Sequence, residues 1–488
     1  MTMSRRKTER QSTFWIAADA LPTGGGHPFY QRMNAGLAEQ GFDDWVHKRC
    51  EPYYAKEGAP GLSPAIYFRC LMVGYFEGID SERGIAWRVE DSFSLRQFLG
   101  IDLTEATPFH STISRTRQRL PVEVHGEVFQ WILGTLYQHG LIEGQTLGID
   151  ATTLEANAAM RSIVRRDTGE TYEQYLTRLA EASGVETPSN DELARFDKHR
   201  KNKASNADWR HPHDPDAKVT KMKDGRTHLA HKCEHGVDLA TGAVLSVTLH
   251  DATTGDTTSW RDTFEEAATN VHEGYALRQH QQEAETPEAA YQEVGDEEND
   301  DEGTGLGSIF QEVVADKGYH SNETMTDMRE MGMRSYVSEP DRGKRHWKNK
   351  REAQEAVYAN RRRMKGERGN RLRKKRGELI ERSFAHTCET GAMRRTHLRG
   401  HENILKRLLI HVGAFNLGLL MRRVLGVGTP KGLQGVAAWF LRLLTALLMR
   451  LRIAQTALHR LRSFQSRAEA GLPGTTAPRN PYLVPAAA

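Results

Sequence analysis

Apolar positions in the N-terminal part of the chain recur every three or four residues, the spacing of helices that bury one face. The clearest predicted helix covers residues 63–78, because Ser and Pro suit its first positions and Gly suits its end. The same spacing predicts helices over residues 81–89, 109–120 and 122–139. We therefore predict an all-helical N-terminal domain over residues 1–140.

The predicted helix over residues 109–120 is basic and carries Arg115, Arg117 and Arg119. Short helices separated by tight turns, with the last one basic, are typical of a helix-turn-helix array whose final helix enters the major groove of DNA. The alternative is an ordinary helical domain with exposed arginines. On the first interpretation, these three arginines contact DNA.

The pattern changes at Leu141, where β-branched and apolar residues predict a strand that ends at Asp150. A hairpin is predicted over residues 227–251, and a later strand places Asp316 just before a Lys-Gly turn. Further elements are predicted as helices over 259–270 and 322–331 and a strand over 334–338. Strands and helices in this order predict an α/β fold, with a mixed sheet flanked by helices.

The chain is too long for one compact core, so several domains are expected. Polar and acidic stretches interrupt the part that follows the helical domain. The predicted divisions are an α/β domain (141–424) with a helical insertion (155–225), an acidic disordered loop (281–306) and a basic segment (342–376), then an amphipathic helix with a flexible tail (425–488).

The net charge of +3 conceals two blocks of opposite sign. Residues 281–303 carry ten acids and no Lys or Arg, whereas residues 342–376 carry 16 Lys and Arg against three Glu. A basic block of this density is typical of a surface that follows a phosphate backbone, and its alternative is a solvated face. The candidate DNA-binding residues in it are Arg361, Arg362, Arg363, Lys374 and Lys375.

Several other classes of protein are excluded by the residue pattern. The four cysteines are far apart and form no CxxC pair, which argues against disulfides or a zinc ribbon and fits a reducing cytoplasm. The histidines and Cys233 between residues 211 and 235 also fit no standard zinc spacing. The most apolar stretch, over residues 433–449, is interrupted by Arg442, so no membrane span is expected.

Asp150 and Asp316 each lie near the end of a predicted strand, and a later helix carries further acids. Carboxylates that converge in this way suit Mg²⁺, which takes oxygen ligands and keeps several waters. Two such ions can activate an attacking oxygen and stabilise a leaving oxygen during displacement at phosphorus. The sequence therefore predicts phosphoryl-transfer chemistry.

The strings GIDATTLEANAAMRSIVRRDTGE, VVADKGYHS and GELIERSFAH resemble those of DDE transposases from bacterial insertion sequences, in particular the eleven-eighty-two group. The resemblance covers about residues 63–427. It implies an RNase H-like catalytic domain with two Mg²⁺ ions, for which Mn²⁺ can substitute. It also implies binding to double-stranded DNA at terminal inverted repeats and at the target, a homodimer on DNA, and a cytoplasmic, nucleoid-associated protein. Asp150, Asp316 and Glu381 match the catalytic and metal-binding triad of that family.

The third acid departs from the family pattern. Related transposases place Tyr, Arg, Glu and Lys in the order Y-x2-R-x3-E-x6-K, but counted from Glu381 these positions hold Lys374, Gly377 and Cys388. Glu378 and Glu389 therefore remain competitors. Two other functions also stay open, namely a structure-specific nuclease without strand transfer and a DNA-binding repressor without catalysis.

Overall fold

The computed structural model describes residues 3, 26–185, 188–200, 205–222, 225–285, 309–343 and 345–433. Residues up to 430 form one compact unit, and residues 431–488 form a second. The predicted amphipathic helix and tail lie almost wholly outside the described residues, as does most of the predicted acidic loop. The domain boundaries predicted at residues 140 and 424 stay predictions.

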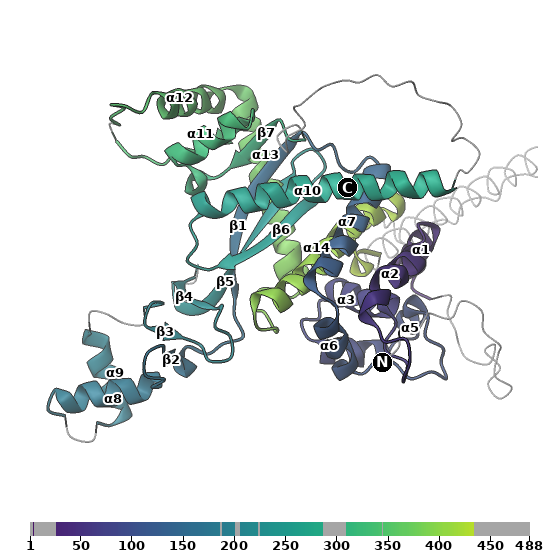
Figure 1. Cartoon of the computed structure of the whole chain (residues 1–488), viewed down its shortest axis with the longest axis horizontal. Helices are drawn as coiled ribbons and strands as arrows, with labels where there is room; N and C mark the ends of the chain where they lie inside the picture. The colour runs from purple at the N-terminus through teal and green to yellow at the C-terminus, as the bar shows by residue number, and fades with distance from the viewer. Residues whose placement is uncertain are drawn as a thin grey trace, which may run out of the picture. The chain divides into compact units, whose positions relative to one another are not determined.

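The first described part of the chain is entirely helical (Figure 1). Its helices are α1 (Pro28–Glu39), α2 (Phe42–Cys50), α3 (Pro64–Glu77), α4 (Glu82–Glu90), α5 (Phe93–Leu99), α6 (His110–Arg119) and α7 (Val122–Gln138), with a 3-10 turn at Glu51–Tyr53. Gly78 ends α3 because its φ of 71° is a conformation that favours glycine. The Ser81 hydroxyl caps α4 by accepting a hydrogen bond from the backbone N–H of Gly84. The four helices predicted from apolar spacing are all present.

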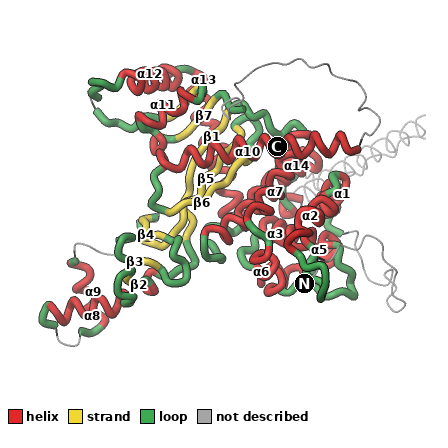
Figure 2. The backbone as a smooth tube through the Cα atoms, in the orientation of Figure 1, coloured by secondary structure: helices red, strands yellow, loops and turns green. Residues whose placement is uncertain are grey.

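A mixed six-stranded sheet follows the helices, so the predicted α/β fold is confirmed at the level of its class (Figure 2). Its strands are β1 (Thr146–Glu155), β4 (Lys218–Lys221), β5 (Thr227–Asp238), β6 (Val244–Asp251), β7 (Glu312–Ala315) and β8 (Arg334–Val337). β5 is antiparallel to β1 on one side and to β4 and β6 on the other. β7 is parallel to β1, and β8 is parallel to β7.

Two helices cover opposite faces of this sheet. Successive strand residues point to opposite faces, and β5 shows which helix lies on which face. The Glu234 carboxylate accepts hydrogen bonds from α10 (Asp256–Glu285), whereas the next residue, His235, contacts Ser383 on α13 (Glu367–Ala385). α10 crosses in front of the sheet in Figure 1.

The remaining helices of the α/β region are α11 (Asn322–Glu330), α12 (Arg351–Lys365) and α14 (His401–Leu425), and a short π-helical turn (His386–Thr390) follows α13. α14 packs against α3 and α7 of the helical region and against β6 of the sheet. In the described part of the chain, the helix over His401–Leu433 is the one long and apolar enough to span a membrane, but 83% of its apolar window is buried. Such burial is typical of a helix in a protein core.

The insertion between β1 and β5 contains both helices and short strands. It consists of β2 (Val164–Arg165), β3 (Trp209–Arg210), α8 (Tyr172–Ala182), α9 (Asn190–His199) and a 3-10 turn at Met160–Ser162, and it leads into β4. Trp209, Ile163 and Leu229 belong to one small apolar cluster, and Leu176 and Leu193 belong to another. The prediction of a helical insertion therefore missed the short strands β2 and β3.

Two predicted boundaries were wrong. The helix predicted over residues 259–270 is α10 and runs from Asp256 to Glu285, because residues 271–285 are rich in helix-forming Ala, Leu, Arg, Gln and Glu. Residues 281–285, predicted to lie in the acidic loop, therefore belong to this helix. The strand predicted to end at Asp150 continues to Glu155, because β5 pairs with β1 over this whole stretch.

Candidate active site

Asp150 on β1 lies beside Asp316, which stands at the end of the neighbouring parallel strand β7. The β1–β7 register pairs Thr146 with Glu312 and Gly148 with Val314. Two residues further along, the same register brings Asp150 level with Asp316, which directly follows β7. The structure thus brings together the two aspartates predicted from the sequence.

The Asp150 carboxylate is partly buried and paired with a cation. Burial raises its pKa, and the guanidinium of Arg376 on α13 opposes that rise. The Arg376 Nη1 lies 2.5 Å from the Asp150 Oδ2, while the backbone N–H of Ala151 donates to the Asp150 Oδ1 at 2.8 Å. Arg376 is a residue of this site that the sequence interpretation did not single out, because an arginine within a basic run carries no mark of its partner.

The Asp316 carboxylate caps the short 3-10 turn Lys317–Tyr319. Its Oδ1 accepts a hydrogen bond of 2.7 Å from the backbone N–H of Gly318. A Cβ at Gly318 would overlap the Asp256 carboxylate and lie 3.0 Å from the Asp316 Oδ1. Asp256, the first residue of α10, is therefore a further carboxylate at this end of the site. Asp256 could not be recognised from the sequence, because an acid in the first turn of a helix has an ordinary stabilising role.

Glu381 lies on α13 and is exposed. Its neighbours Ile380 and Ser383 are buried, so this part of α13 turns Glu381 away from the residues that pack on the sheet. Both competitors are exposed as well: Glu378 pairs with Arg382 at 2.6 Å, and Glu389 pairs with Arg394. The choice among the three glutamates therefore stays a prediction.

The donor set at the aspartate pair fits a divalent cation only in part. Two adjacent carboxylates, one of them substantially buried, are suitable oxygen ligands for Mg²⁺. Within the described residues, however, no group of three or more His, Cys, Asp or Glu side chains is arranged to hold a metal ion. Asp150 and Asp316 are the residues that would hold such an ion.

The three arginines of α6 lie in different environments. Arg115 is exposed. Arg117 is buried, pairs with Glu82 and donates a hydrogen bond of 3.1 Å to Asn403 on α14. The Arg119 guanidinium lies 4.8 Å from the centre of the Tyr54 ring. In this structure Arg115 presents its charge to solvent, whereas Arg117 joins α6 to α4 and α14.

The candidate DNA-binding residues on α12 also include both exposed arginines and arginines that bind other parts of the protein. Arg361 binds Glu339 through two hydrogen bonds of 2.5 and 2.8 Å, and these bonds lower the pKa of Glu339 to about 2. Arg363 donates to the backbone oxygen and the hydroxyl of Ser335 on β8. Arg362 is exposed. Two of the three arginines therefore attach α12 to the sheet region.

On α13, Lys374 is exposed and Lys375 is half-buried. The same helix carries Arg368, whose guanidinium forms two hydrogen bonds of 2.8 and 2.6 Å with Glu312 at the start of β7. Arg368 and Arg376 thus attach α13 to the two strands that carry the aspartates. The exposed side of α13 still carries basic residues, among them Arg371, Arg373 and Lys374.

A groove of about 1180 Å³ is lined by residues other than the aspartates. It is bordered by α2, α7, α10, α14 and β6, and its carboxylates include Glu123, Glu127 and Glu266. Burial raises the pKa of Glu266. An acid-lined groove repels a phosphate backbone, so we place the candidate site at the aspartate pair and not in this groove.

The chain thus has a mixed sheet with two aspartates side by side at the ends of neighbouring parallel strands, and basic helices pack near them. Residues 27–119 match the family model described as "Transposase domain (DUF772)", and residues 327–421 match the one described as "Transposase DDE domain". These matches confirm that the chain resembles DDE transposases of the insertion-sequence type. No curated protein and no solved structure matches the chain.

The two matched stretches cover different parts of the site. Glu381 lies inside the second stretch, whereas Asp150 and Asp316 lie outside both. The family matches therefore support the transposase function, and the choice of the individual acids depends on the β1–β7 register and on the sequence motifs.

Proposed function

We propose that the chain is a DDE transposase that binds the terminal inverted repeats of an insertion sequence and catalyses metal-dependent DNA cleavage and strand transfer. The observation that carries the proposal is the alignment of Asp150 with Asp316 across β1 and β7, in a chain that matches two transposase domains. Along the path β4-β5-β1-β7-β8, three antiparallel strands are followed by two parallel ones, and β6 is also antiparallel to β5; this order supports an RNase H-like core.

Asp150 and Asp316 would hold the metal, and Glu381 is our proposed third acid. Two Mg²⁺ ions, for which Mn²⁺ substitutes, would supply an activated attacking oxygen and stabilise the leaving oxygen. The residues of the chain place the carboxylates and orient the DNA. The exposed Arg362 and Lys374 contact phosphates, and Arg115 on α6 approaches the recognised sequence.

The partners follow from this proposal. The substrates are double-stranded DNA at the element's ends and at the target, and we propose that a homodimer assembles on DNA to bring two ends together. A protein with this substrate acts in the bacterial cytoplasm, in association with the nucleoid.

The decisive experiment incubates the protein with a DNA fragment that bears the element's ends, with Mg²⁺ or with a chelator. We expect cleavage and joined products only with Mg²⁺. Asp150→Asn and Asp316→Asn keep the size of the side chain but remove its charge, so DNA binding should persist while cleavage falls by a factor on the order of 10² to 10³ or more. Cleavage without joining would favour the nuclease, and binding without cleavage would favour the repressor.

The same assay tests the third acid. We expect Glu381→Gln to abolish cleavage, whereas Glu378→Gln and Glu389→Gln should cleave as the unaltered protein does. If one of the latter is inactive and Glu381→Gln is active, the third acid is misassigned. Activity in all three variants would show that the third ligand comes from elsewhere in the chain.

A further inference from the structure

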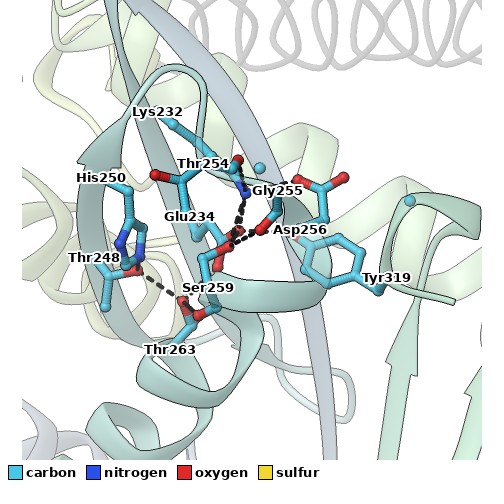
Figure 3. A network of polar contacts seen from close by, with 12 residues as sticks. Lys232, Glu234, Thr248, His250, Thr254, Gly255, Asp256, Ser259, Thr263 and Tyr319 are labelled. Atoms are coloured by element: carbon cyan, nitrogen blue, oxygen red, sulfur yellow. Dashed lines mark hydrogen bonds and ion pairs between the residues drawn. The ribbon is translucent and has the colours of Figure 1, made fainter. Parts of the chain in front are cut away.

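A buried network of charged and hydroxyl groups lies on the α10 face of the sheet and includes Tyr319, three residues after Asp316 (Figure 3). Lys232 and Glu234 are two residues apart on β5, so both side chains point to this face. The Lys232 Nζ lies 2.8 Å from the Glu234 Oε1 and 2.7 Å from the Asp256 Oδ1. Both β5 side chains are buried, although charged groups normally stay in water.

The buried Glu234 carboxylate has a donor for each of its oxygens. Its Oε1 accepts hydrogen bonds from the Ser259 hydroxyl at 2.5 Å and from the Tyr319 hydroxyl at 3.1 Å. Its Oε2 accepts one from the Thr263 hydroxyl at 2.6 Å. Removal of such charges from water is costly, and a fully bonded network of this kind holds its members in one geometry.

The network reaches Asp316 along two routes. Tyr319 is the last residue of the 3-10 turn that Asp316 caps, and its ring is buried while its hydroxyl binds Glu234. Asp256, fixed by Lys232, lies against Gly318 in the same turn. Gly318 is the residue whose backbone N–H binds the Asp316 carboxylate. Gly318 and Tyr319 are therefore both contacted by residues on the α10 face of the sheet, Gly318 by Asp256 and Tyr319 by Glu234.

We infer that Lys232, Glu234 and Tyr319 are positioning residues that fix the Asp316 carboxylate for metal binding, an inference that rests on the proposed function. None of the three belongs to the aspartate pair. These residues act on Asp316 through the turn Lys317–Tyr319. β7 ends at Ala315, so Asp316 and this turn lie outside the paired strand. Without the Tyr319–Glu234 bond, the carboxylate would occupy its metal-binding position for less of the time.

The sharpest test is Tyr319→Phe, because phenylalanine keeps the buried ring and removes only the hydroxyl. The matched control is Thr248→Val, which removes a hydroxyl that binds Thr263 at 2.7 Å on the side of the network away from Tyr319 (Figure 3). Mn²⁺ binding is measured without DNA by electron paramagnetic resonance, alongside the melting temperature and the Mg²⁺ concentration for half-maximal cleavage. A merely structural role would lower the melting temperature in both variants and leave the metal affinity of the folded protein unchanged.

We expect Tyr319→Phe to weaken Mn²⁺ binding at least tenfold, in the range typical of residues that orient metal ligands, and to raise the Mg²⁺ requirement in proportion. Thr248→Val should bind Mn²⁺ as the unaltered protein does. Lys232→Met serves as a second variant, with an effect in the same direction. Unchanged Mn²⁺ binding by folded Tyr319→Phe overturns the inference alone, whereas absence of Mn²⁺ binding and of cleavage in the unaltered protein overturns the proposed function with it.

Discussion

The Asp150 carboxylate already has a cationic partner in the Arg376 guanidinium. The pair is mostly buried, with the two side chains 24% and 15% exposed, so its attraction is stronger than that of a surface pair. A metal ion at Asp150 would have to share or displace this partner. Arg376 can therefore both stabilise the carboxylate without metal and reduce its affinity for metal.

We expect Arg376→Gln to bind Mn²⁺ several-fold more tightly than the unaltered protein in the absence of DNA, because a competing cation is removed. The matched control is Arg382→Gln on the same helix, whose arginine pairs with Glu378 at the surface. Isothermal titration with Mn²⁺ measures both variants. Weaker binding by Arg376→Gln would mean that the guanidinium holds Asp150 in its metal-binding position instead of competing for it.

The sequence predicted the two aspartates but not their surroundings. Asp150 and Asp316 each belong to a short motif beside an apolar strand, so local pattern and family resemblance both identify them. Asp256 and Arg376 come to the site only through packing of α10 and α13 on the sheet. Glu381 matched a motif, yet the direction of its side chain depends on the rotation of α13 about its axis, which a motif does not give.

At the scale of elements, α12 and α13 each carry two kinds of basic residue, those that bind other parts of the protein and those that are exposed to solvent. A dense basic run predicts a phosphate-binding surface, but it does not predict that Arg361 binds Glu339 or that Arg363 binds Ser335. These partners lie 22 and 28 residues away in the sequence. Contacts over such distances form only after the sheet and helices have packed. The exposed Arg362 and Lys374 therefore carry the prediction of DNA contact.

Replacement of Arg362 and Lys374 by alanine should flatten the salt dependence of DNA binding. Each lost phosphate contact reduces the slope of log affinity against log salt by roughly 0.9 on duplex DNA. Fluorescence anisotropy across a salt series measures this slope. As a contrast, Arg361→Ala should lower the melting temperature, since it removes the two bonds to Glu339, while it changes the slope less. An equal slope in the double variant and the unaltered protein would assign these residues to solvent.

At the scale of the whole molecule, the order of helices and strands was predictable, and their lengths were less so. Apolar spacing located α3, α4, α6 and α7, and the hairpin motif located β5 and β6. Lengths depend on partners: β1 continues past Asp150 because β5 pairs with it there. The RNase H-like core stays a proposal.

The acidic stretch provides a test at this scale. We expect a chain that lacks residues 288–302 to fold with an unchanged melting temperature, because this stretch is rich in acids and poor in apolar residues. The deletion leaves α10, which ends at Glu285, and the described chain before β7 intact. Differential scanning calorimetry checks the expectation. A large fall in melting temperature would show that the acidic stretch packs against the core, and stronger nonspecific DNA binding would show that it screens the basic helices.

α14 connects the helical region to the sheet through polar contacts as well as apolar packing. The Arg407 guanidinium donates to the Ile79 carbonyl after α3, and the Asn416 side chain makes hydrogen bonds of 3.0 and 2.7 Å with the backbone of Val244 on β6. Under the proposed function, α14 thus makes direct contacts both with the helical region that reads the DNA and with the sheet that carries the cutting edge, and we expect these contacts to keep the two at a fixed distance. Such a protein would cut at a fixed distance from the sequence that it recognises. The number of base pairs between the recognised sequence and the cut is then set by the distance between these two parts of the protein. Insertion of about five base pairs, half a helical turn, would present the wrong face of the duplex to the aspartates.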